Sequence, residues 1–286
     1  MNDYIILTDT GCDLTAEMIE ALGIRVLALE LNIEGNTSAS KDIGVKEFYD
    51  QLRTGKKATT SAIGIDRFSR TMEPVLKVGK DILYLGFSSG LSGTFNAGFV
   101  AARELAERYP GRKIYTVDTL AASMGQGLLV YHAARMKAEG ASIEEVRDFV
   151  ENNKLNLCHW FTVDDLMFLK RGGRINAATA VMGTMLSIKP VLHVDNDGKL
   201  ISVSKARGRK AAIDALFLKM GETGTDLEGQ TVFISHGDCI DDANYLAKKI
   251  KEKYSVKDII IGFIGPVIGA HSGPGTLALF YLGTHR

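Results

Sequence analysis

The sequence has few cysteines, few prolines and no excess of charge of either sign. Its three cysteines, Cys12, Cys158 and Cys239, are odd in number and far apart, so they fit neither a disulfide framework nor a metal motif. Lysine plus arginine and aspartate plus glutamate both number 34, which gives a formal net charge of zero. A nucleic-acid-binding protein usually carries a basic patch or stripe, and the sequence shows none. We therefore expect a cytoplasmic protein without a nucleic-acid partner.

The sequence also lacks clear signals for export, membrane insertion or nucleotide binding. Its start has no basic region of the kind that opens a secretory signal. The stretch from Ile259 to Thr284 has no aspartate, glutamate, lysine or arginine and is long enough to span a bilayer. Its glycines and prolines break it into short pieces, so we expect two buried strands around a loop from Gly265 to Thr276. No Gly-x-x-x-x-Gly-Lys-Ser/Thr loop is present, so we expect no ATP site in this chain.

Short apolar runs alternate with amphipathic segments through the first half of the sequence. Strands are expected at Tyr4 to Leu7, Arg25 to Ile33, Asp81 to Gly86 and Lys113 to Asp118, with helices between them. This alternation is typical of a mainly parallel sheet that is covered by helices on both faces. The pattern predicts an N-terminal three-layer α/β/α domain over residues 1–155.

The alternation of predicted strands and helices changes near residue 155. The turn signal Asp195-Asn196-Asp197-Gly198 lies between two apolar runs and predicts a β-hairpin. Further strands and helices surround it, and a helix of small residues is expected from Asn176 to Leu186. A hairpin within a strand and helix pattern indicates a mixed sheet, so residues 156–286 are expected to form a two-layer α/β domain.

The stretch from Phe87 to Ala97 is the most informative part of the sequence for function. It joins a predicted buried strand to a predicted helix, a position where ligands bind in parallel α/β sheets. Its glycines allow a ligand to approach the backbone, and the helix start offers unpaired N–H groups and a partial positive charge. With its serine and threonine hydroxyls, the stretch predicts a site for a carboxylate, a phosphate or another oxyanion. The alternative is a turn of small residues with serine helix caps.

The same stretch permits a second functional interpretation. Gly86 to Gly90 matches the Gly-x-Ser-x-Gly nucleophile elbow around Ser88, and His236 or His271 downstream would complete a serine–histidine order. In such an elbow the helix begins directly after the serine, whereas four residues intervene here, and no acidic third member is evident. A serine esterase that uses Ser88 is therefore kept as the alternative.

Other polar residues fall in glycine-rich loops. His271 lies in the loop from Gly265 to Thr276 and could donate to an anionic ligand or be satisfied by loop carbonyls. Arg171 and Arg174 flank two glycines, so they are either solvated charges or a basic loop suited to a phosphate or an acidic partner. His236 has no second pair of metal ligands nearby, so we expect no metal.

Several motifs together resemble the DegV family of bacterial lipid-binding proteins, and the resemblance extends over nearly the whole chain. These motifs are Thr8-Asp9-Thr10 with Asp13-Leu14, Thr60-Ser61, Ser88 to Thr94, Val117-Asp118-Thr119, Leu169 to Ile175, Lys189-Pro190, Asp197-Gly198, His236-Gly237-Asp238 and Gly265 to Thr276. The resemblance implies two α/β domains with a long-chain fatty acid bound at their interface. Apart from this ligand it implies no cofactor.

The resemblance also implies roles for individual residues. The fatty-acid carboxylate would be bound by Thr60, Ser61, Ser92, Gly93, Thr94 and His271. The chain would be the carrier subunit of a bacterial fatty-acid kinase, without activity of its own. It would present the carboxylate to a separate ATP-dependent kinase subunit, which forms acyl phosphate for phospholipid synthesis. Arg171 and Arg207 would then contact that partner or the phosphate.

Overall fold

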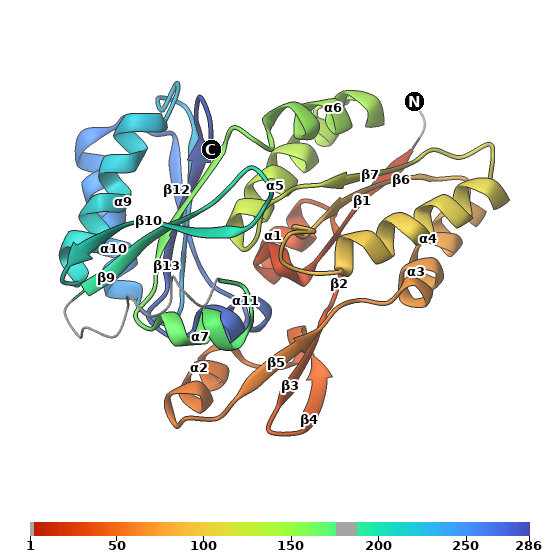
Figure 1. Cartoon of the computed structure of the whole chain (residues 1–286). Coiled ribbons are helices and arrows are strands. Elements are labelled where there is room, and N and C mark those ends of the chain that lie inside the picture. The colour runs from red at the N-terminus through yellow and green to blue at the C-terminus, as the bar shows by residue number, and fades with distance from the viewer. Residues whose placement is uncertain (1–2, 176–187) are drawn as a thin grey trace.

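The computed structural model describes residues 3–175 and 188–286, which form three β-sheets with helices packed around them (Figure 1). Sheet A lies on the right of Figure 1, sheet C on the left, and the small sheet B below them. The helix expected from Asn176 to Leu186 lies outside the described residues.

Sheet A is parallel throughout. Its strands, in spatial order, are β2 (Arg25–Leu27), β1 (Tyr4–Asp9), β6 (Asp81–Gly86) and β7 (Ile114–Asp118). Strands β1 and β6 are buried at every position, as expected for strands that are covered on both faces. One face packs against α3 (Ile65–Lys77) and α4 (Thr94–Arg108), and the other against α1 (Ala16–Ala21), α5 (Met124–Ala138) and α6 (Ile143–Asn153). The expected three-layer α/β/α arrangement is confirmed.

Sheet C is mixed, as predicted. In spatial order it contains β10 (Leu200–Arg207), β9 (Ile188–Val194), β8 (Leu157–Thr162), β13 (Leu277–Leu282), β11 (Thr231–His236) and β12 (Asp258–Phe263). Among neighbouring pairs of these described strands, only β11 and β12 are parallel. Helices α9 (Arg209–Thr223) and α10 (Ile240–Lys253) cover one face. The division into domains at residue 155 stays a prediction.

Helix α5 lies between sheets A and C. Every residue from Met124 to Val130 is buried, because one side of the helix packs on sheet A and another packs on β11 and β13 of sheet C. Phe233 and Phe280 of sheet C therefore share one hydrophobic cluster with Ile6 and Leu83 of sheet A. The mostly apolar composition of this helix follows from burial on both sides.

The expectation of a single strand from Arg25 to Ile33 is wrong. Only β2 joins sheet A, whereas β3 (Glu30–Ile33) pairs with β4 (Asn36–Ala39) and β5 (Ala58–Ser61) in the antiparallel sheet B. The change occurs at Leu29, whose N–H donates to Thr10 Oγ1 and whose carbonyl accepts from the Ser40 N–H. These partners lie far along the chain, so the apolar run alone does not show the break. Helix α2 (Val45–Arg53) packs on sheet B.

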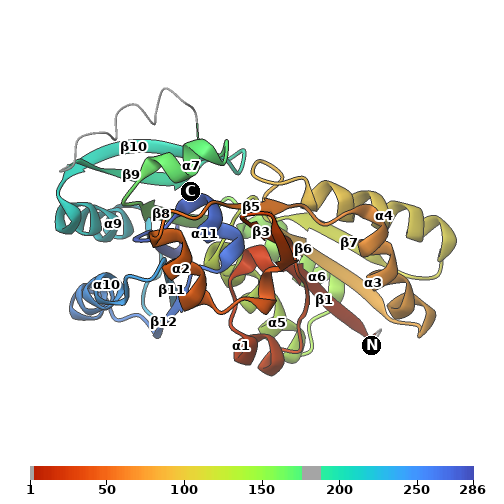
Figure 2. The ribbon, with the colours of Figure 1, turned by 90° about the horizontal axis from the view of Figure 1, so that it is seen from below.

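The loop expected from Gly265 to Thr276 also contains regular structure. It includes α11 (Pro266–Ser272), which begins with a proline in its first turn and ends at Gly273, where φ is 79°. Proline at a helix start and glycine after its end are favourable, so the residues interpreted as loop signals are helix boundaries. Viewed from below, α11 lies between the two large sheets, near α2, β5 and the short α7 (Leu166–Arg171) (Figure 2).

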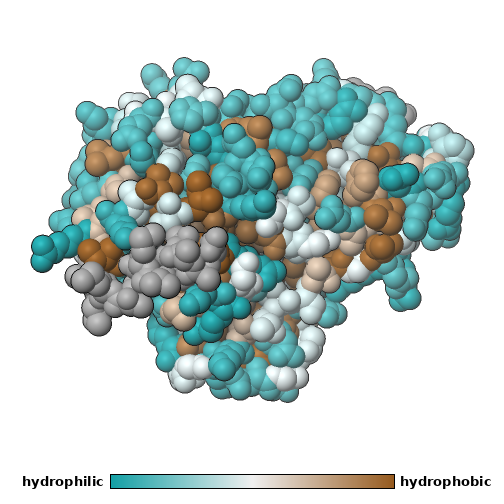
Figure 3. Space-filling model, in the orientation of Figure 1, coloured by the Kyte–Doolittle hydropathy of each residue, from teal (hydrophilic) through white to brown (hydrophobic). Residues whose placement is uncertain are grey.

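The face shown in Figure 3 is mostly hydrophilic, with separate small patches of apolar side chains. Within residues 3–175 and 188–286, no helix is long and apolar enough to cross a bilayer.

A buried carboxylate, Asp9, joins the end of β1 to two other elements. Its Oδ1 accepts from the Gly11 N–H at 3.0 Å and from Gln126 Nε2 at 3.3 Å, and its Oδ2 accepts from the Phe87 N–H at 3.0 Å and the Tyr84 hydroxyl at 3.1 Å. Burial raises the pKa of Asp9, whereas these hydrogen bonds lower it. The four donors compensate the cost of burying this group.

We expect Asp9→Asn to destabilise the fold by roughly 2–4 kcal/mol, because an amide nitrogen at one of these positions leaves buried donors without an acceptor. Urea denaturation of the two proteins measures the difference. Asp66→Asn, on an exposed carboxylate of α3, is the matched control and should change stability by less than about 0.5 kcal/mol. Equal effects of the two substitutions would contradict the role given to Asp9.

Candidate ligand-binding site

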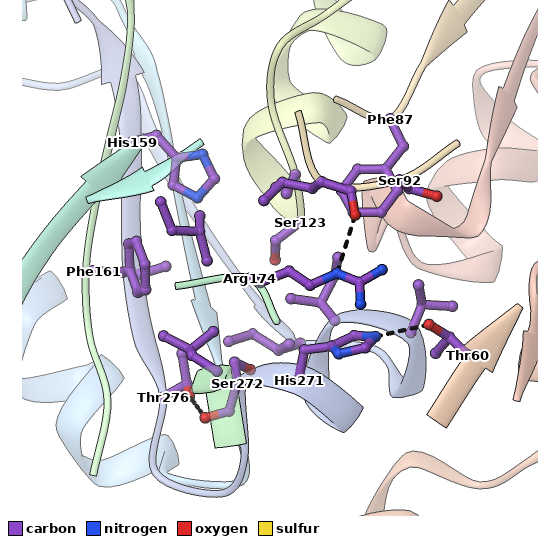
Figure 4. A pocket seen from close by; sticks show the side chains of 18 of the residues that line it. Thr60, Phe87, Ser92, Ser123, His159, Phe161, Arg174, His271, Ser272 and Thr276 are labelled. Carbon is purple, nitrogen blue, oxygen red and sulfur yellow. Dashed lines mark hydrogen bonds between the residues drawn. The ribbon is translucent and has the colours of Figure 1, made fainter. Parts of the chain in front are cut away.

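A cavity lies between sheet C, α11 and the turn that follows β6 (Figure 4). Most of its wall is apolar and consists of Leu29, Phe87, Leu91, Ala122, Phe161, Leu169, Leu200, Ile264, Val267, Ile268 and Ala278. Its polar lining residues are Thr60, Ser92, Ser123, His159, Arg174, His271, Ser272 and Thr276. Such a wall suits a ligand that is largely apolar with one polar group.

Thr60 and His271 form the closest polar pair in this cavity. Thr60 Oγ1, on β5, lies 2.7 Å from His271 Nε2, on α11 (Figure 4). Burial, with a further contribution from the Arg174 charge, lowers the pKa of His271 to about 4. The imidazole is therefore neutral at neutral pH, so one of its nitrogens donates and the other accepts. Together the two side chains can bind an anionic ligand without a fixed charge of their own.

Ser92 also lines the cavity, from the turn between β6 and α4. Its Oγ accepts from the Thr94 N–H at 3.2 Å and lies 3.0 Å from Thr94 Oγ1. The predicted turn at a helix start is therefore present, and its serine reaches the cavity. Gly93 and Thr94 form the first turn of α4, and they lie outside the set of described residues that line the cavity.

Arg174 lines the cavity, whereas the sequence indicated only that it belongs to a basic loop. Its Nε donates to the Leu91 carbonyl at 3.1 Å, and its guanidinium also donates to the Gly172 carbonyl. Two glycines turn the chain inward: Gly173 has φ of 69°, and a Cβ at Gly172 would lie 2.3 Å from His271 Nδ1. Burial lowers the pKa of Arg174. The basic loop therefore points one arginine into the cavity.

The other predicted site residues lie elsewhere. Arg171 is exposed, with its guanidinium 4.4 Å from the centre of the Phe168 ring. Arg207 is exposed at the end of β10, and Ser61 is exposed at the end of β5. None of these three is among the described residues that line the cavity. The structure thus brings Thr60, Ser92 and His271 together, and leaves the others at the surface or behind the wall.

The geometry around Ser88 does not support a nucleophile elbow. Ser88 is fully buried; its Oγ donates to the Gly198 carbonyl at 2.8 Å and accepts from the Gly90 N–H. A Cβ at Gly90 would lie 2.6 Å from the Asp197 carbonyl oxygen, so this glycine allows the β9–β10 turn to approach. Within the described part of the chain, no histidine is hydrogen-bonded to Ser88. The residues of the Gly-x-Ser-x-Gly pattern therefore pack against the β9–β10 turn.

Ser123, which lines the cavity, belongs to a small polar cluster. Its hydroxyl donates to Asp13 Oδ2 at 2.6 Å and lies 3.0 Å from Ser235 Oγ. Burial raises the pKa of Asp13 to about 7, even though the Ser123 hydrogen bond lowers it. The described residues contain no group of three or more potential metal ligands, so this cluster is polar without being a metal centre.

The match to known families agrees with these features. The family model described as "Uncharacterised protein, DegV family" matches residues 4–284, almost the whole chain. The chain belongs to the DegV family. The resemblance inferred from its motifs is confirmed, and so is the α/β fold class.

Two DegV relatives show how far the similarity extends in sequence. A DegV domain-containing protein of Clostridium perfringens is 48% identical over 286 residues, which cover 99% of this chain and 98% of that protein. Another, from Streptococcus pyogenes, is 34% identical over 283 residues and covers 98% of each chain.

Solved DegV structures share the fold over nearly the full length. A DegV family protein from Thermus thermophilus, described as fatty acid binding, has a TM-score of 0.90 at 30% identity and covers 99% of this chain and 100% of that chain. DegV from Bacillus subtilis, described as a fatty acid binding protein, has a TM-score of 0.86 at 27% identity, with the same coverage. The cavity therefore occurs in a fold that is shared with these two proteins, both of which are described as binding fatty acids.

Asp13 should make stability depend on pH. Because its folded-state pKa of about 7 is above the ordinary value of 3.8, the folded protein binds this proton more tightly than the unfolded chain does. The contribution of this proton to the free energy of unfolding is fully present below about pH 4 and is lost as the pH rises to about 7. Over this range the free energy of unfolding falls by at most about 1.4 kcal/mol per pH unit. Asp13→Asn should remove this slope.

Urea denaturation across this pH range compares the wild type with Asp13→Asn. Asparagine is a suitable replacement because Asp13 has φ of 52°, a left-handed conformation in which asparagine is also common. Its amide oxygen can still accept from the Ser123 hydroxyl. Parallel stability profiles for the two proteins would show that Asp13 does not titrate in this range.

Proposed function

We propose that this chain binds a long-chain fatty acid in the cavity, with the carboxylate held by Thr60, Ser92 and His271. The observation that supports this most directly is the Thr60–His271 pair, which lies with Ser92 in an otherwise apolar cavity. The descriptions of the Thermus thermophilus and Bacillus subtilis proteins as fatty acid binding support the same ligand class.

The energetics of the cavity suit this ligand. Each buried methylene of an acyl chain contributes about 0.8 kcal/mol, and the apolar wall offers the surface that this requires. The carboxylate has to find donors there, because an unpaired buried charge is very unfavourable. The hydroxyls, the neutral imidazole and Arg174 provide them.

The remaining residues of the predicted set would act from around this cluster. Gly93 and Thr94 start α4, whose unpaired N–H groups and partial positive charge favour a nearby anion. Thr94 also holds Ser92 through the contact between their hydroxyls. The Ser61 side chain is exposed, so Ser61 would contribute to carboxylate binding only through its backbone at the end of β5.

We expect Ser92→Ala and Thr60→Ala each to weaken fatty-acid retention, because each removes a hydrogen bond to a charged group worth about 1.5–3 kcal/mol. Native mass spectrometry of the purified protein measures how much of it carries a bound fatty acid. Ser61→Ala is the matched control, since it removes an exposed hydroxyl from the same strand as Thr60. Occupancy that stays at the wild-type level in both cavity variants would contradict the proposed carboxylate site.

We further propose that the chain is a cytoplasmic carrier that presents the carboxylate to a separate ATP-dependent kinase. In that reaction a carboxylate oxygen attacks the γ-phosphorus of ATP, ADP leaves, and the acyl phosphate formed is used for phospholipid synthesis. The sequence has no phosphate-binding loop of its own, which supports a separate source of ATP. Arg171 and Arg207 are exposed outside the cavity, as contacts to a partner or to its phosphate would require.

Arg171→Ala should leave the bound fatty acid in place and slow acyl-phosphate formation by a reconstituted carrier and kinase. The reason is that a guanidinium can hold a carboxylate or a phosphate through two parallel hydrogen bonds, which alanine cannot replace. Native mass spectrometry reports the first property and a coupled assay of ADP release the second.

Arg70→Ala removes an exposed arginine from α3 and is the control for a general loss of positive charge. Loss of the fatty acid from Arg171→Ala would instead assign Arg171 to the cavity. ATP hydrolysis by the isolated wild-type chain would refute the carrier function itself.

A further inference from the structure

His159 is a polar residue of the cavity that the proposed carboxylate site does not use. It lies on β8, and Figure 4 shows it on the opposite side of the cavity from Thr60 and His271. Its neighbours on this face of sheet C are apolar: Phe161 is two residues further along β8, and Phe280 is its partner on β13. The cavity therefore has a polar group in an apolar setting on the side remote from Thr60 and His271.

The imidazole of His159 is buried without compensation. The residue is only 4% exposed, and its Nδ1 has no hydrogen-bond partner among the described residues. The Phe280 ring packs against it at 4.6 Å between centres, and a Cβ at Gly125 would lie 3.2 Å from Nδ1. Nδ1 thus faces α5 and is closed off there. Nε2, for which no hydrogen bond is found among the described residues, is the ring nitrogen that a ligand in the cavity can approach (Figure 4).

The protonation state limits what that partner can be. Burial holds the pKa of His159 well below its ordinary value of 6.5, so the ring is neutral, with one nitrogen that donates and one that accepts. The methylenes of a plain acyl chain can do neither. A saturated chain would therefore leave a buried polar group unpaired, a cost that leucine at this position would avoid.

We propose that His159 selects acyl chains that carry an oxygen substituent, a hydroxyl or a keto group, within the apolar part of the chain. A hydroxyl can both donate and accept, so it fits a neutral imidazole of either tautomer. This inference rests on the proposed fatty-acid function and specifies the substrate class of that site. Thr60, Ser92 and His271 hold the carboxylate, and His159 binds the oxygen of the tail.

The test compares the affinities of stearate and a positional series of monohydroxystearates for delipidated wild-type protein and for His159→Leu. The ratio of the dissociation constant of stearate to that of the tightest hydroxystearate measures the preference. We expect this ratio to fall about three- to tenfold in His159→Leu, the value of one hydrogen bond. The affinity for stearate should stay the same or increase.

Phe161→Leu is the matched control, because it trims an apolar residue of the same strand face and should weaken both ligands alike. A ratio that is unchanged in His159→Leu overturns the inference, and it is the result expected if a bound water satisfies the imidazole. Wild-type protein that binds neither stearate nor any hydroxystearate refutes the fatty-acid function, and this inference with it. Normal stearate binding without a His159-dependent ratio refutes only the inference.

A second measurement does not depend on the folding of a variant. In wild-type protein with ¹⁵N-labelled histidine, the tightest hydroxystearate should shift the His159 ring-nitrogen resonances, because a new hydrogen bond changes their environment. Stearate should shift them much less. The same shift with both ligands would show that the tail oxygen does not contact His159.

Discussion

The buried Asp9 carboxylate is the interaction on which the arrangement of the cavity depends. It accepts hydrogen bonds from the ends of β1 and β6 and from α5, so it holds three elements at one point. The Phe87 N–H that it binds opens the turn that carries Ser92. A group outside the cavity lining therefore positions one wall of the site, because a buried carboxylate has to keep all of its donors.

Helix α5 connects this part of sheet A to sheet C. It packs on sheet A and on sheet C, and the turn before it supplies Ala122 and Ser123 to the cavity wall. The apolar tail region thus forms where two sheets share one hydrophobic cluster, whereas the polar end is built by β5, α11 and the turn before α4. The separation of these two environments suits a ligand with one charged end.

Sequence patterns predicted the features that depend on burial or on neighbouring residues. Strands covered on both faces give continuous apolar runs, so the layers of sheet A and the mixed sheet C were recognisable, and Ser92 followed from a local turn at a helix start. The break at Leu29 and the inward path of Arg174 were missed. Both depend on distant hydrogen bonds or on a positive φ at Gly173, which apolar periodicity does not report.

The pairing of Thr60 with His271 joins residues that are 211 positions apart. Neither half of the chain contains both, so the site has no local precursor and cannot form before the segment that carries His271 has been made. During synthesis the site is therefore completed late. A ligand that bridges this pair adds its binding free energy to the folded whole, since the unfolded chain offers no comparable site. A ligand bound at this pair would then indicate that both distant parts of the chain have folded.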